Sequence, residues 1–351
     1  MSEVTTVGVD LAKNVIVVCA ANMVGKVLLF KQFSFRAFGE WAAKVPPCVF
    51  AMETCGSAHY WARRLSGYGH SVRLMAAELV KPFRMSQAAK NDRNDAEAIA
   101  LAARHPGMRF VTVKSADQQA MLSWHRMRKA WSIERTAMIN RMRGLLSEFG
   151  IWLGRSPGML KRALPELLEA QTLPPHFRSL LRLAWEQLHS LEARIEASEV
   201  EILMHAKTSD DARRISAISG VGVLTASAIV STVLYAKDFK NGRQLAAWMG
   251  LVPRQYSSGG KERMGQITRR GDAYLRGLLT QGARSALRAA QMSKFEGRTR
   301  LQRWMVDLHG RVGYQKALVA IANKHARMIW AILATQKSYD PDAWRLHTQA
   351  A

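Results

Sequence analysis

The first hundred residues alternate between short apolar runs and amphipathic stretches. Three β-branched runs come first and are separated by turn signals such as Gly25, at residues 4–9, 15–20 and 27–33. Short runs of this kind predict strands, and their short connections predict an antiparallel meander. Helical periodicity and further short strands then alternate, with helices expected at 35–44, 58–68 and 92–103 and strands at 48–52 and 71–75.

The resulting order of elements, β-β-β-α-β-α-β-α, is that of an RNase H-like α/β domain. This order places four carboxylates at informative positions. Asp10 lies at the end of the first strand and Glu53 at the end of the fourth. Asp92 and Asp95 are three residues apart, so they share one helix face. If the strand ends and this face converge, the acids form a site of hard oxygen ligands, which suits one or two Mg²⁺ ions in phosphoryl transfer.

Each acid also has a plainer interpretation. Asp92 suits a helix N-cap, and Asp95 suits the first turn of a helix, where the dipole favours acids. An acid just past a buried strand, as at Asp10 or Glu53, is common in turns. Taken together and in this order, the four acids nevertheless favour a metal site.

The middle of the chain is helical, basic and rich in leucine at helical spacing. Helices are expected over 115–150 and 176–207, and four prolines interrupt the stretch 154–175, which indicates a hinge or the end of a hairpin. This pattern predicts an antiparallel helical hairpin or coiled coil, either a dimerisation arm or an ordinary helical subdomain. Its arginines are either nucleic-acid contacts or a solvated face, and the candidates are Arg126, Arg128 and Arg141.

Two glycines, Gly220 and Gly222, stand between apolar helical stretches within residues 215–230. The pattern resembles a helix-hairpin-helix, in which glycines let the backbone approach a phosphate and the N–H groups of the second helix bind it. A tight helix–helix turn that needs positive φ is the alternative.

Two adjacent hydroxyls, Ser257 and Ser258, lie on a Gly-rich stretch just after Pro253. A serine on such a loop is a candidate nucleophile toward phosphate when arginines hold the phosphate oxygens and offset charge in the transition state. The cations and candidate nucleic-acid contacts around it are Arg254, Lys261, Arg263, Arg269, Arg270 and Arg276. A polar turn on a basic face is the plainer interpretation, because Ser-Gly pairs are common in turns.

The last third of the chain is expected to be mostly helical. Helices are predicted over 239–251, 273–292, 295–309 and 314–335, with Asp272 as the N-cap of the second. We therefore expect four segments: an acidic catalytic domain over 1–112, the helical hairpin over 113–207, a domain with the two-glycine element and the serine loop over 208–292, and basic helices over 293–351.

The net charge of +24 narrows the choice of partners. So large an excess indicates a polyanion, most simply nucleic acid. A membrane surface is not favoured, because we find no run of about 18 uncharged apolar residues, no secretory signal and no lipidation motif. The three cysteines form no CxxC pair, so neither a zinc site nor a disulfide framework is indicated, and a reducing cytoplasm is expected.

Several segments carry a specific resemblance to a known family. VGVDLAKN, AMETCGSAHYW and KNDRNDAEAIA resemble the N-terminal RuvC-like DEDD domain of the insertion-sequence "one-ten" family of transposases. The stretches FKNGRQLAAWMGLVPRQYSSGGKERMGQITRRGDAYLRGLL and GYQKALVAIANKHARMIWAIL resemble that family's C-terminal transposase domain, which is mostly α-helical. The likeness covers most of the chain and both signature regions.

The resemblance implies a mechanism and a set of partners. In similar proteins the serine of the "SG" that follows a GLxPR stretch is the nucleophile; this serine maps onto Ser258, with Ser257 and Tyr256 as neighbouring hydroxyls. DNA strand exchange would proceed through a covalent 5′-phosphoserine, with Mg²⁺ held by the four acids. Composite sites would require a dimer, and a tetramer when two DNAs are joined. A non-coding bridge RNA would pair with donor and target double-stranded DNA, in the cytoplasm at the nucleoid.

Two alternatives stay open at this point. A RuvC-like junction nuclease would use the four acids to hydrolyse DNA with water, and the serine loop would only bind. A non-catalytic nucleic-acid-binding protein would use the acids structurally. The acid quartet argues against the second alternative, and the serine loop argues against the first.

Overall fold

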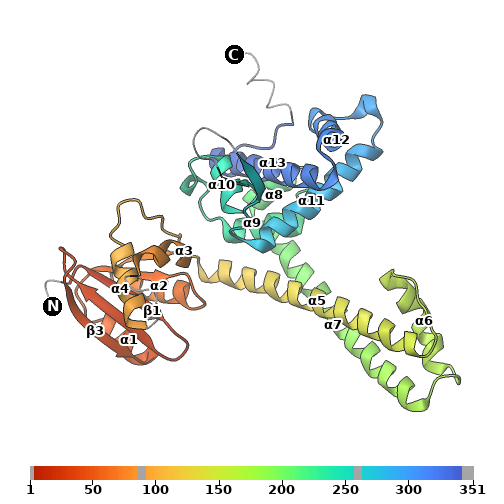
Figure 1. The fold of residues 1–351 in the computed structure, drawn as a ribbon, viewed down its shortest axis with the longest axis horizontal. Helices are drawn as coiled ribbons and strands as arrows, with labels where there is room; N and C mark the ends of the chain where they lie inside the picture. Colours follow the sequence, from red (N-terminus) through yellow and green to blue (C-terminus); the bar gives the residue numbers. More distant parts are fainter. Residues whose placement is uncertain (1–3, 85–91, 257–262, 342–351) are drawn as a thin grey trace. The chain divides into compact units, whose positions relative to one another are not determined.

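The chain divides into two compact units at Gln119. The computed structural model describes residues 4–84, 92–256 and 263–341 (Figure 1). The first unit is an α/β domain, and the second is almost entirely helical. This division into an α/β part followed by a helical part agrees with the fold class that the sequence predicts.

One mixed sheet forms the centre of the first unit. Its strands, in chain order, are β1 (Thr6–Leu11), β2 (Ile16–Ala21), β3 (Val27–Phe33), β4 (Val49–Glu53) and β5 (Ser71–Met75). They lie in the order β3-β2-β1-β4-β5. The first three are antiparallel neighbours, whereas β4 runs parallel to β1 and β5 runs parallel to β4. The predicted meander and order of elements are confirmed, and both are consistent with an RNase H-like domain.

Helices cover both faces of this sheet. They are α1 (Phe35–Ala42), α2 (Ala58–Gly67), the short α3 (Ala77–Val80) and α4 (Asp92–Ala102). Side chains alternate along a strand, so neighbouring residues of β4 serve different cores. Phe50 packs with Phe38 of α1 and Trp61 of α2, whose ring centroids are 4.7 Å apart. Ala51 packs with Ile99 of α4 on the opposite face.

A long helical hairpin opens the second unit. α5 (Ala116–Glu148) and α7 (Pro175–Thr208) form its two arms, and both predicted helices are confirmed to within two residues at each end. Arg128 of α5 forms an ion pair with Glu199 of α7. Met142 and Leu181 belong to one buried cluster further along the hairpin. These two contacts show that the arms are antiparallel.

The stretch between the two arms differs from the prediction. The prolines predict a broken segment, but α6 (Pro157–Glu169) occupies most of it. Pro157 is tolerated because it stands in the first turn, where its missing N–H has no helical partner to lose. Pro165 lies inside the helix. Burial of Leu160 and Leu164 in the hairpin core outweighs the hydrogen bond lost at that proline.

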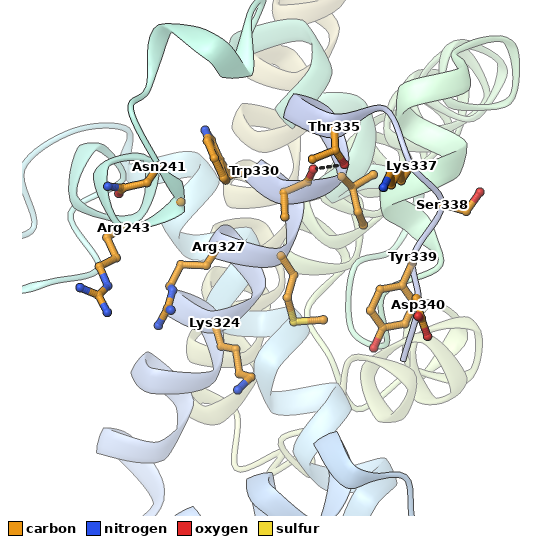
Figure 2. Close-up of a pocket in the computed structure, with 14 residues that line it drawn as sticks. Asn241, Arg243, Lys324, Arg327, Trp330, Thr335, Lys337, Ser338, Tyr339 and Asp340 are labelled. Atoms are coloured by element: carbon orange, nitrogen blue, oxygen red, sulfur yellow. Dashed lines mark hydrogen bonds between the residues drawn. The ribbon is translucent and has the colours of Figure 1, made fainter. Parts of the chain in front are cut away.

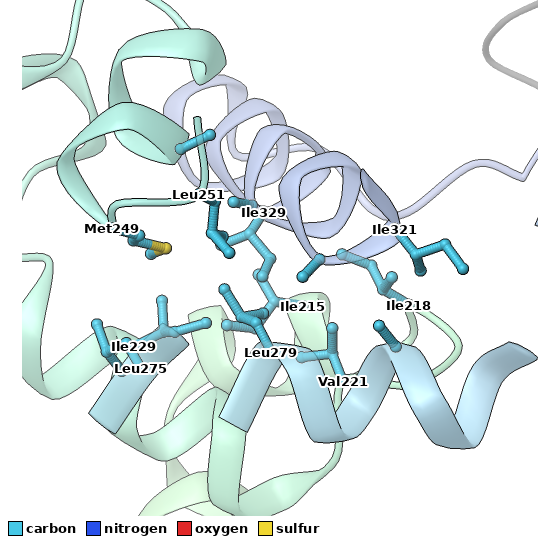
Figure 3. Close-up of a cluster of buried hydrophobic side chains, with 14 of the residues drawn as sticks. Ile215, Ile218, Val221, Ile229, Met249, Leu251, Leu275, Leu279, Ile321 and Ile329 are labelled. Atoms are coloured by element: carbon cyan, nitrogen blue, oxygen red, sulfur yellow. The ribbon is translucent and has the colours of Figure 1, made fainter. Parts of the chain in front are cut away.

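The remaining helices of the second unit share one apolar core. In chain order they are α8 (Asp210–Ser216), α9 (Val223–Thr232), α10 (Gly242–Trp248), α11 (Ala273–Met292), α12 (Arg300–Val312) and α13 (Tyr314–Thr335). Ile215, Ile229, Leu279 and Ile329 come from four of these helices and meet in the core (Figure 3). Packing of apolar faces from separate helices is what gives this unit its stability.

Several helices of this unit begin directly after a residue whose side chain caps the helix N-terminus. The predicted helices 273–292 and 314–335 are confirmed, and Asp272 caps the first of them through the N–H groups of Tyr274 and Leu275. α10 is shorter than predicted because Asn241 starts it. α12 starts later than predicted because Thr299 forms a capping box there.

Among the described residues, α13 has the length and apolar composition of a helix that could span a membrane. Half of its apolar stretch is nevertheless buried inside the protein, and the helix packs against α8, α10, α11 and α12. It also carries Lys324 and Arg327. We therefore assign α13 as the core helix of the second unit.

Candidate active site: an acidic sheet edge and a basic hairpin

Asp10 and Glu53 lie next to each other at one edge of the sheet. β1 and β4 are parallel neighbours in the register Gly8–Ala51, so the ends of both strands reach the same edge. Asp10 shares a face of the sheet with Gly8, and Glu53 shares that face with Ala51, because side chains alternate along each strand. Ala51 packs with α4. Both acids therefore project on the side of the sheet that α4 covers.

The backbone of α4 packs closely against the backbone of β1 because Gly8 has no side chain. A Cβ atom at Gly8 would overlap the carbonyl oxygen of Ala96 and would lie 2.6 Å from the amide nitrogen of Ala100. Glycine inside a strand often marks such a close approach. The contact holds α4 directly against β1. The first turn of α4, which carries Asp92 and the buried Asp95, therefore lies near Asp10.

A basic residue that the sequence analysis did not single out lies among these acids. Arg84 directly follows the 3₁₀ turn Lys81–Phe83. Its Nε atom lies 2.8 Å from Asp95 Oδ1, and its Nη2 atom lies 3.7 Å from Glu53 Oε1. No periodicity or spacing connects Arg84 with either acid in the sequence, so only the fold brings them together.

Burial and mutual repulsion change how these acids ionise. The pKa of Asp10 rises from 3.8 to about 6, first because the carboxyl group is buried and then because Asp95, Asp92 and Glu53 carry like charge. Burial also raises the pKa of Glu53. Arg84 opposes both shifts because its positive charge favours the ionised carboxylates. A further cation at this edge would relieve the remaining repulsion.

The chemistry of this donor set fits a divalent cation. Carboxylate oxygens are the ligands that Mg²⁺ and Mn²⁺ prefer, and the buried Glu53 Oε1 has no hydrogen-bond partner among the described residues. As the side chains stand, no three His, Cys, Asp or Glu residues in the described ranges are close enough to hold one ion. The Arg84 guanidinium group lies close to two of the acids, Asp95 and Glu53.

The serine stretch connects two strands that the sequence analysis did not predict. β6 (Pro253–Gln255) and β7 (Met264–Ile267) are antiparallel, and Tyr256 N donates to Arg263 O at 2.8 Å. These strands are short and almost fully exposed, so they lack the apolar alternation by which strands are recognised. Three residues of the predicted site lie outside the described residues, between the two strands: Ser257, Ser258 and Lys261.

The base of this hairpin is fixed by the surrounding helices. Gly271, with φ of 92°, packs so closely that a Cβ atom there would overlap the backbone of α10. Arg276 of α11 donates to Met249 O at 3.1 Å, and Asn323 of α13 donates to Leu251 O at 3.3 Å. The predicted nucleic-acid contact Arg276 thus also holds the hairpin in place.

Exposed arginines line the hairpin stem. Arg254, Tyr256 and Arg269 border a cavity of about 260 Å³. Arg263 and Arg270 are also exposed. Guanidinium groups around a small hollow suit the oxygens of a phosphate group, so the stem has the chemistry that its predicted role in nucleic-acid binding needs.

The other predicted nucleic-acid contacts differ in their surroundings. Arg126 and Arg141 are exposed on α5, and neither forms an ion pair within the described ranges. Arg128 is already engaged, because its guanidinium group donates to Glu199 across the hairpin. Contact with nucleic acid stays a prediction for all three, and Arg128 also has a structural role.

The two glycines between α8 and α9 also differ. Gly220 has φ of 90°, and a Cβ atom there would lie 2.5 Å from the carbonyl oxygen of Gly282 on α11. Its geometry is that of a tight turn packed against a helix. Gly222 is the N-cap of α9 and has open space beside its Cα atom. Of the two glycines, Gly222 is the one beside which there is space for a phosphate group at the start of α9.

A buried polar network that no sequence pattern predicts connects four helices of the second unit. His125 Nδ1 lies 3.0 Å from Tyr274 Oη, and His125 Nε2 lies 3.0 Å from Ser227 Oγ. Ser227 Oγ also lies 2.9 Å from His205 Nδ1. Every group is satisfied when Tyr274 donates to His125, His125 donates to Ser227 and Ser227 donates to His205. Burial first, then the charges of His205 and Arg128, lower the pKa of His125 to about 4.

An acidic edge on a sheet consistent with an RNase H-like fold, in a chain with a strongly basic helical unit, defines a class of nucleic-acid phosphoryl-transfer proteins. Comparison with known proteins makes the assignment specific. A family model described as "Transposase IS116/IS110/IS902 family" matches residues 212–299, and an IS110-type DEDD model described as "Transposase" matches residues 7–151. The chain belongs to the IS110/IS116/IS902 family of transposases.

Similar proteins extend over almost the whole chain. A probable family 20 transposase of Pseudomonas aeruginosa is 42% identical over 97% of this chain and 99% of its own length. The transposases for IS1111A of Coxiella burnetii and IS1328 of Yersinia enterocolitica are 38% and 39% identical, over 97% and 95% of this chain and 92% and 97% of their own lengths. The protein is thus an insertion-sequence transposase, an enzyme of DNA phosphoryl transfer whose DEDD domain implies a divalent metal. The non-catalytic alternative is set aside.

Proposed function

We propose that this transposase exchanges DNA strands through a covalent 5′-phosphoserine at Ser258, under the guidance of a non-coding RNA. The observation that carries the proposal is the gathering of Asp10, Glu53 and Asp95 at one sheet edge, where burial and like charge raise the pKa of Asp10 to about 6. This edge has the character of a metal site for phosphoryl transfer. The arginine-lined stem that flanks residues 257–262 supplies the second half of the chemistry.

The proposed reaction is balanced without an energy source. The Ser258 hydroxyl oxygen forms a bond to the scissile phosphorus while the bond from phosphorus to the 3′ oxygen breaks. The serine proton leaves and the 3′ oxygen gains a proton, which yields a free 3′-OH and a 5′-phosphoserine. Attack by another 3′-OH reverses the step and joins a new pair of strands. One phosphate ester replaces another, so no nucleotide is consumed.

Residues of both units have separate tasks in this proposal. Asp10, Glu53, Asp92 and Asp95 would hold one or two Mg²⁺ ions, which polarise the scissile phosphate when bound. Arg254, Arg263 and Arg269 would hold non-bridging phosphate oxygens beside the serine, with Lys261 and Arg270 nearby. Ser257 and Tyr256 are the neighbouring hydroxyls against which Ser258 must be tested.

The proposed assembly includes RNA and more than one copy of the chain. The net charge of +24 supports binding of several nucleic-acid backbones. A bridge RNA would select donor and target double-stranded DNA by base pairing. Each active site would combine the acidic edge of one subunit with the serine hairpin of another, in a dimer that pairs into a tetramer at synapsis. The predicted location is the cytoplasm, at the nucleoid.

The test is a search for the covalent intermediate. Purified protein is mixed with Mg²⁺, its flanking non-coding RNA and labelled donor and target DNA, and denaturant-resistant adducts are mapped by mass spectrometry. We expect an adduct on Ser258 in wild type and in Ser257→Ala, and no adduct in Ser258→Ala or Asp10→Ala. Metal-dependent cutting that persists in both serine variants without an adduct would support the water-using nuclease instead.

A further inference from the structure

A cavity of about 800 Å³ lies beside α13, in a part of the second unit that the proposed reaction does not use. Figure 2 shows its walls, which come from α13, the start of α10 and the segment that follows α13. It is lined by residues far apart in the sequence, from Asn241 to Asp340. A hollow of this size holds a group as large as a nucleotide.

The charge of this cavity is strongly one-sided. Four of its lining residues are cations, namely Arg243, Lys324, Arg327 and Lys337, and one described lining residue, Asp340, is an acid. Arg243 and Arg327 are exposed, and neither forms an ion pair within the described ranges. In Figure 2 Arg243, Lys324 and Arg327 lie on the same side of the cavity. Several cations beside one cavity attract an anion with several charges.

Lys324 is held in this position by its neighbours. It is half-buried, and its Nζ atom lies over the ring of Trp304 at 4.3 Å from the ring centroid. Burial first, then the charges of Arg327 and Arg300, lower its pKa to about 8. A positive charge that is fixed among other positive charges costs folding energy, and a bound polyanion would offset that cost.

One wall of the cavity is rigid and apolar. Trp330 lines it, and its Nε1 atom donates to Ala236 O at 2.9 Å and to Phe239 O at 3.1 Å. These two bonds tie the connection between α9 and α10 to α13. Exposed Lys237 and Lys240 lie on that connection, close in sequence to Arg243. The basic character therefore extends beyond the cavity itself.

We propose that this cavity and its rim hold the phosphodiester backbone of a nucleic-acid strand, at a site separate from the serine hairpin. Arg243 and Arg327 contact the non-bridging phosphate oxygens, and Lys324 adds positive charge to the cavity. The nucleic-acid strand runs along the cavity wall that contains Trp330. The site deepens the proposed function because it names residues that hold a nucleic-acid partner. It does not depend on the serine chemistry.

The decisive measurement is the salt dependence of binding. Arg243→Gln with Arg327→Gln is compared with Arg36→Gln with Lys44→Gln, two exposed cations of the first unit that remove the same net charge. All variants carry Ser258→Ala, so that binding is measured without a covalent reaction at this position. Labelled duplex DNA and single-stranded RNA are titrated by fluorescence anisotropy at several salt concentrations. Circular dichroism verifies that each variant is folded.

We expect the cavity variant to lose about tenfold or more in affinity for one of the two nucleic acids at low salt. The slope of log K against log salt should fall by about 1.8 if the ligand is duplex DNA and by about 1.4 if it is single-stranded RNA, for two phosphate contacts. The control variant should change by less than half of that. Equal slopes and affinities in the cavity and control variants would overturn the proposal.

A direct contact test separates site binding from long-range attraction. Ala331 is exposed and lines the cavity, so a photoreactive benzophenone side chain at this position should crosslink to the nucleic acid whose binding the arginine variant weakens. A lower salt slope without any crosslink would mean that the arginines act only at a distance, which also overturns the proposal. Absence of a Ser258 adduct from wild-type protein in the strand-exchange assay, with the crosslink at Ala331 retained, would instead count against the serine mechanism alone.

Discussion

Arg84 Nε lies 2.8 Å from Asp95 Oδ1, within an otherwise acidic edge of the sheet. The same guanidinium group approaches Glu53 Oε1 at 3.7 Å. Arg84 is therefore a counter-charge within this group of carboxylates, and it opposes the upward pKa shifts of Asp10 and Glu53.

The first prediction concerns competition between Arg84 and a metal ion. Arg84→Gln removes the competing charge and should tighten Mn²⁺ binding by about 3- to 10-fold, the equivalent of roughly 1 kcal/mol. The measurement is isothermal titration at pH 8, above the pKa of about 6 of Asp10, so that protonation does not interfere. Arg36→Gln, which only removes an exposed pair with Glu40, is the control. Unchanged or weaker Mn²⁺ affinity in Arg84→Gln would contradict this account.

The second prediction concerns the packing of α4 against β1. Gly8→Ala places a Cβ atom against the backbone of Ala96 and Ala100, so the helix must move away from β1. We expect the first unit to lose about 1–3 kcal/mol in its free energy of unfolding, measured by urea denaturation. Gly67→Ala, at the end of α2 with open space around it, should be neutral or slightly stabilising. Equal stability of the two variants would show that α4 is not seated by Gly8.

The third prediction concerns pH. The folded state keeps His125 neutral, with its pKa lowered to about 4, whereas the unfolded chain protonates it near 6.5. The stabilisation is therefore complete above pH 6.5 and is lost as the pH falls toward 4, by roughly 2–3 kcal/mol in total. His125→Gln should flatten the fall in Tm between pH 7.0 and pH 4.5. His176→Gln, which changes an exposed histidine at the start of α7, should leave that fall as in wild type.

The fourth prediction separates two arginines that are close together on α5. Arg126 is exposed, whereas Arg128 pairs with Glu199. If the helical hairpin of α5 and α7 contacts nucleic acid, Arg126→Gln should reduce the slope of log K against log salt by about 0.7–0.9 and leave Tm unchanged. Arg128→Gln should lower Tm because Glu199 loses its partner, by the equivalent of about 0.5–1 kcal/mol. Binding of nucleic acid with a wild-type salt slope in Arg126→Gln would remove this residue from the interface.

The order of the helices and strands, the acidic edge and the class of enzyme could be deduced from the sequence, because the patterns that indicate them are local. The β-branched runs, the helical periodicity and the cap at Asp272 set the elements and their order. Acids at the ends of the first and fourth strands predicted the acidic edge of the sheet, since parallel neighbouring strands end at the same edge. The segments that resemble the transposase family predicted the class of enzyme that the comparisons confirm.

The tertiary structure decided what depends on contacts between distant residues. Arg84 reaches Asp95 only because a 3₁₀ turn and α4 come together, and no pattern in the sequence marks that pair. β6 and β7 are too short and exposed to carry an apolar alternation, and the base of their hairpin is fixed by the distant residue Asn323. The same holds for His125, Ser227 and Tyr274, which lie on three helices and satisfy one another only after those helices pack. Local periodicity fixes where elements begin and end, whereas burial and charge at a site are properties of the packed chain.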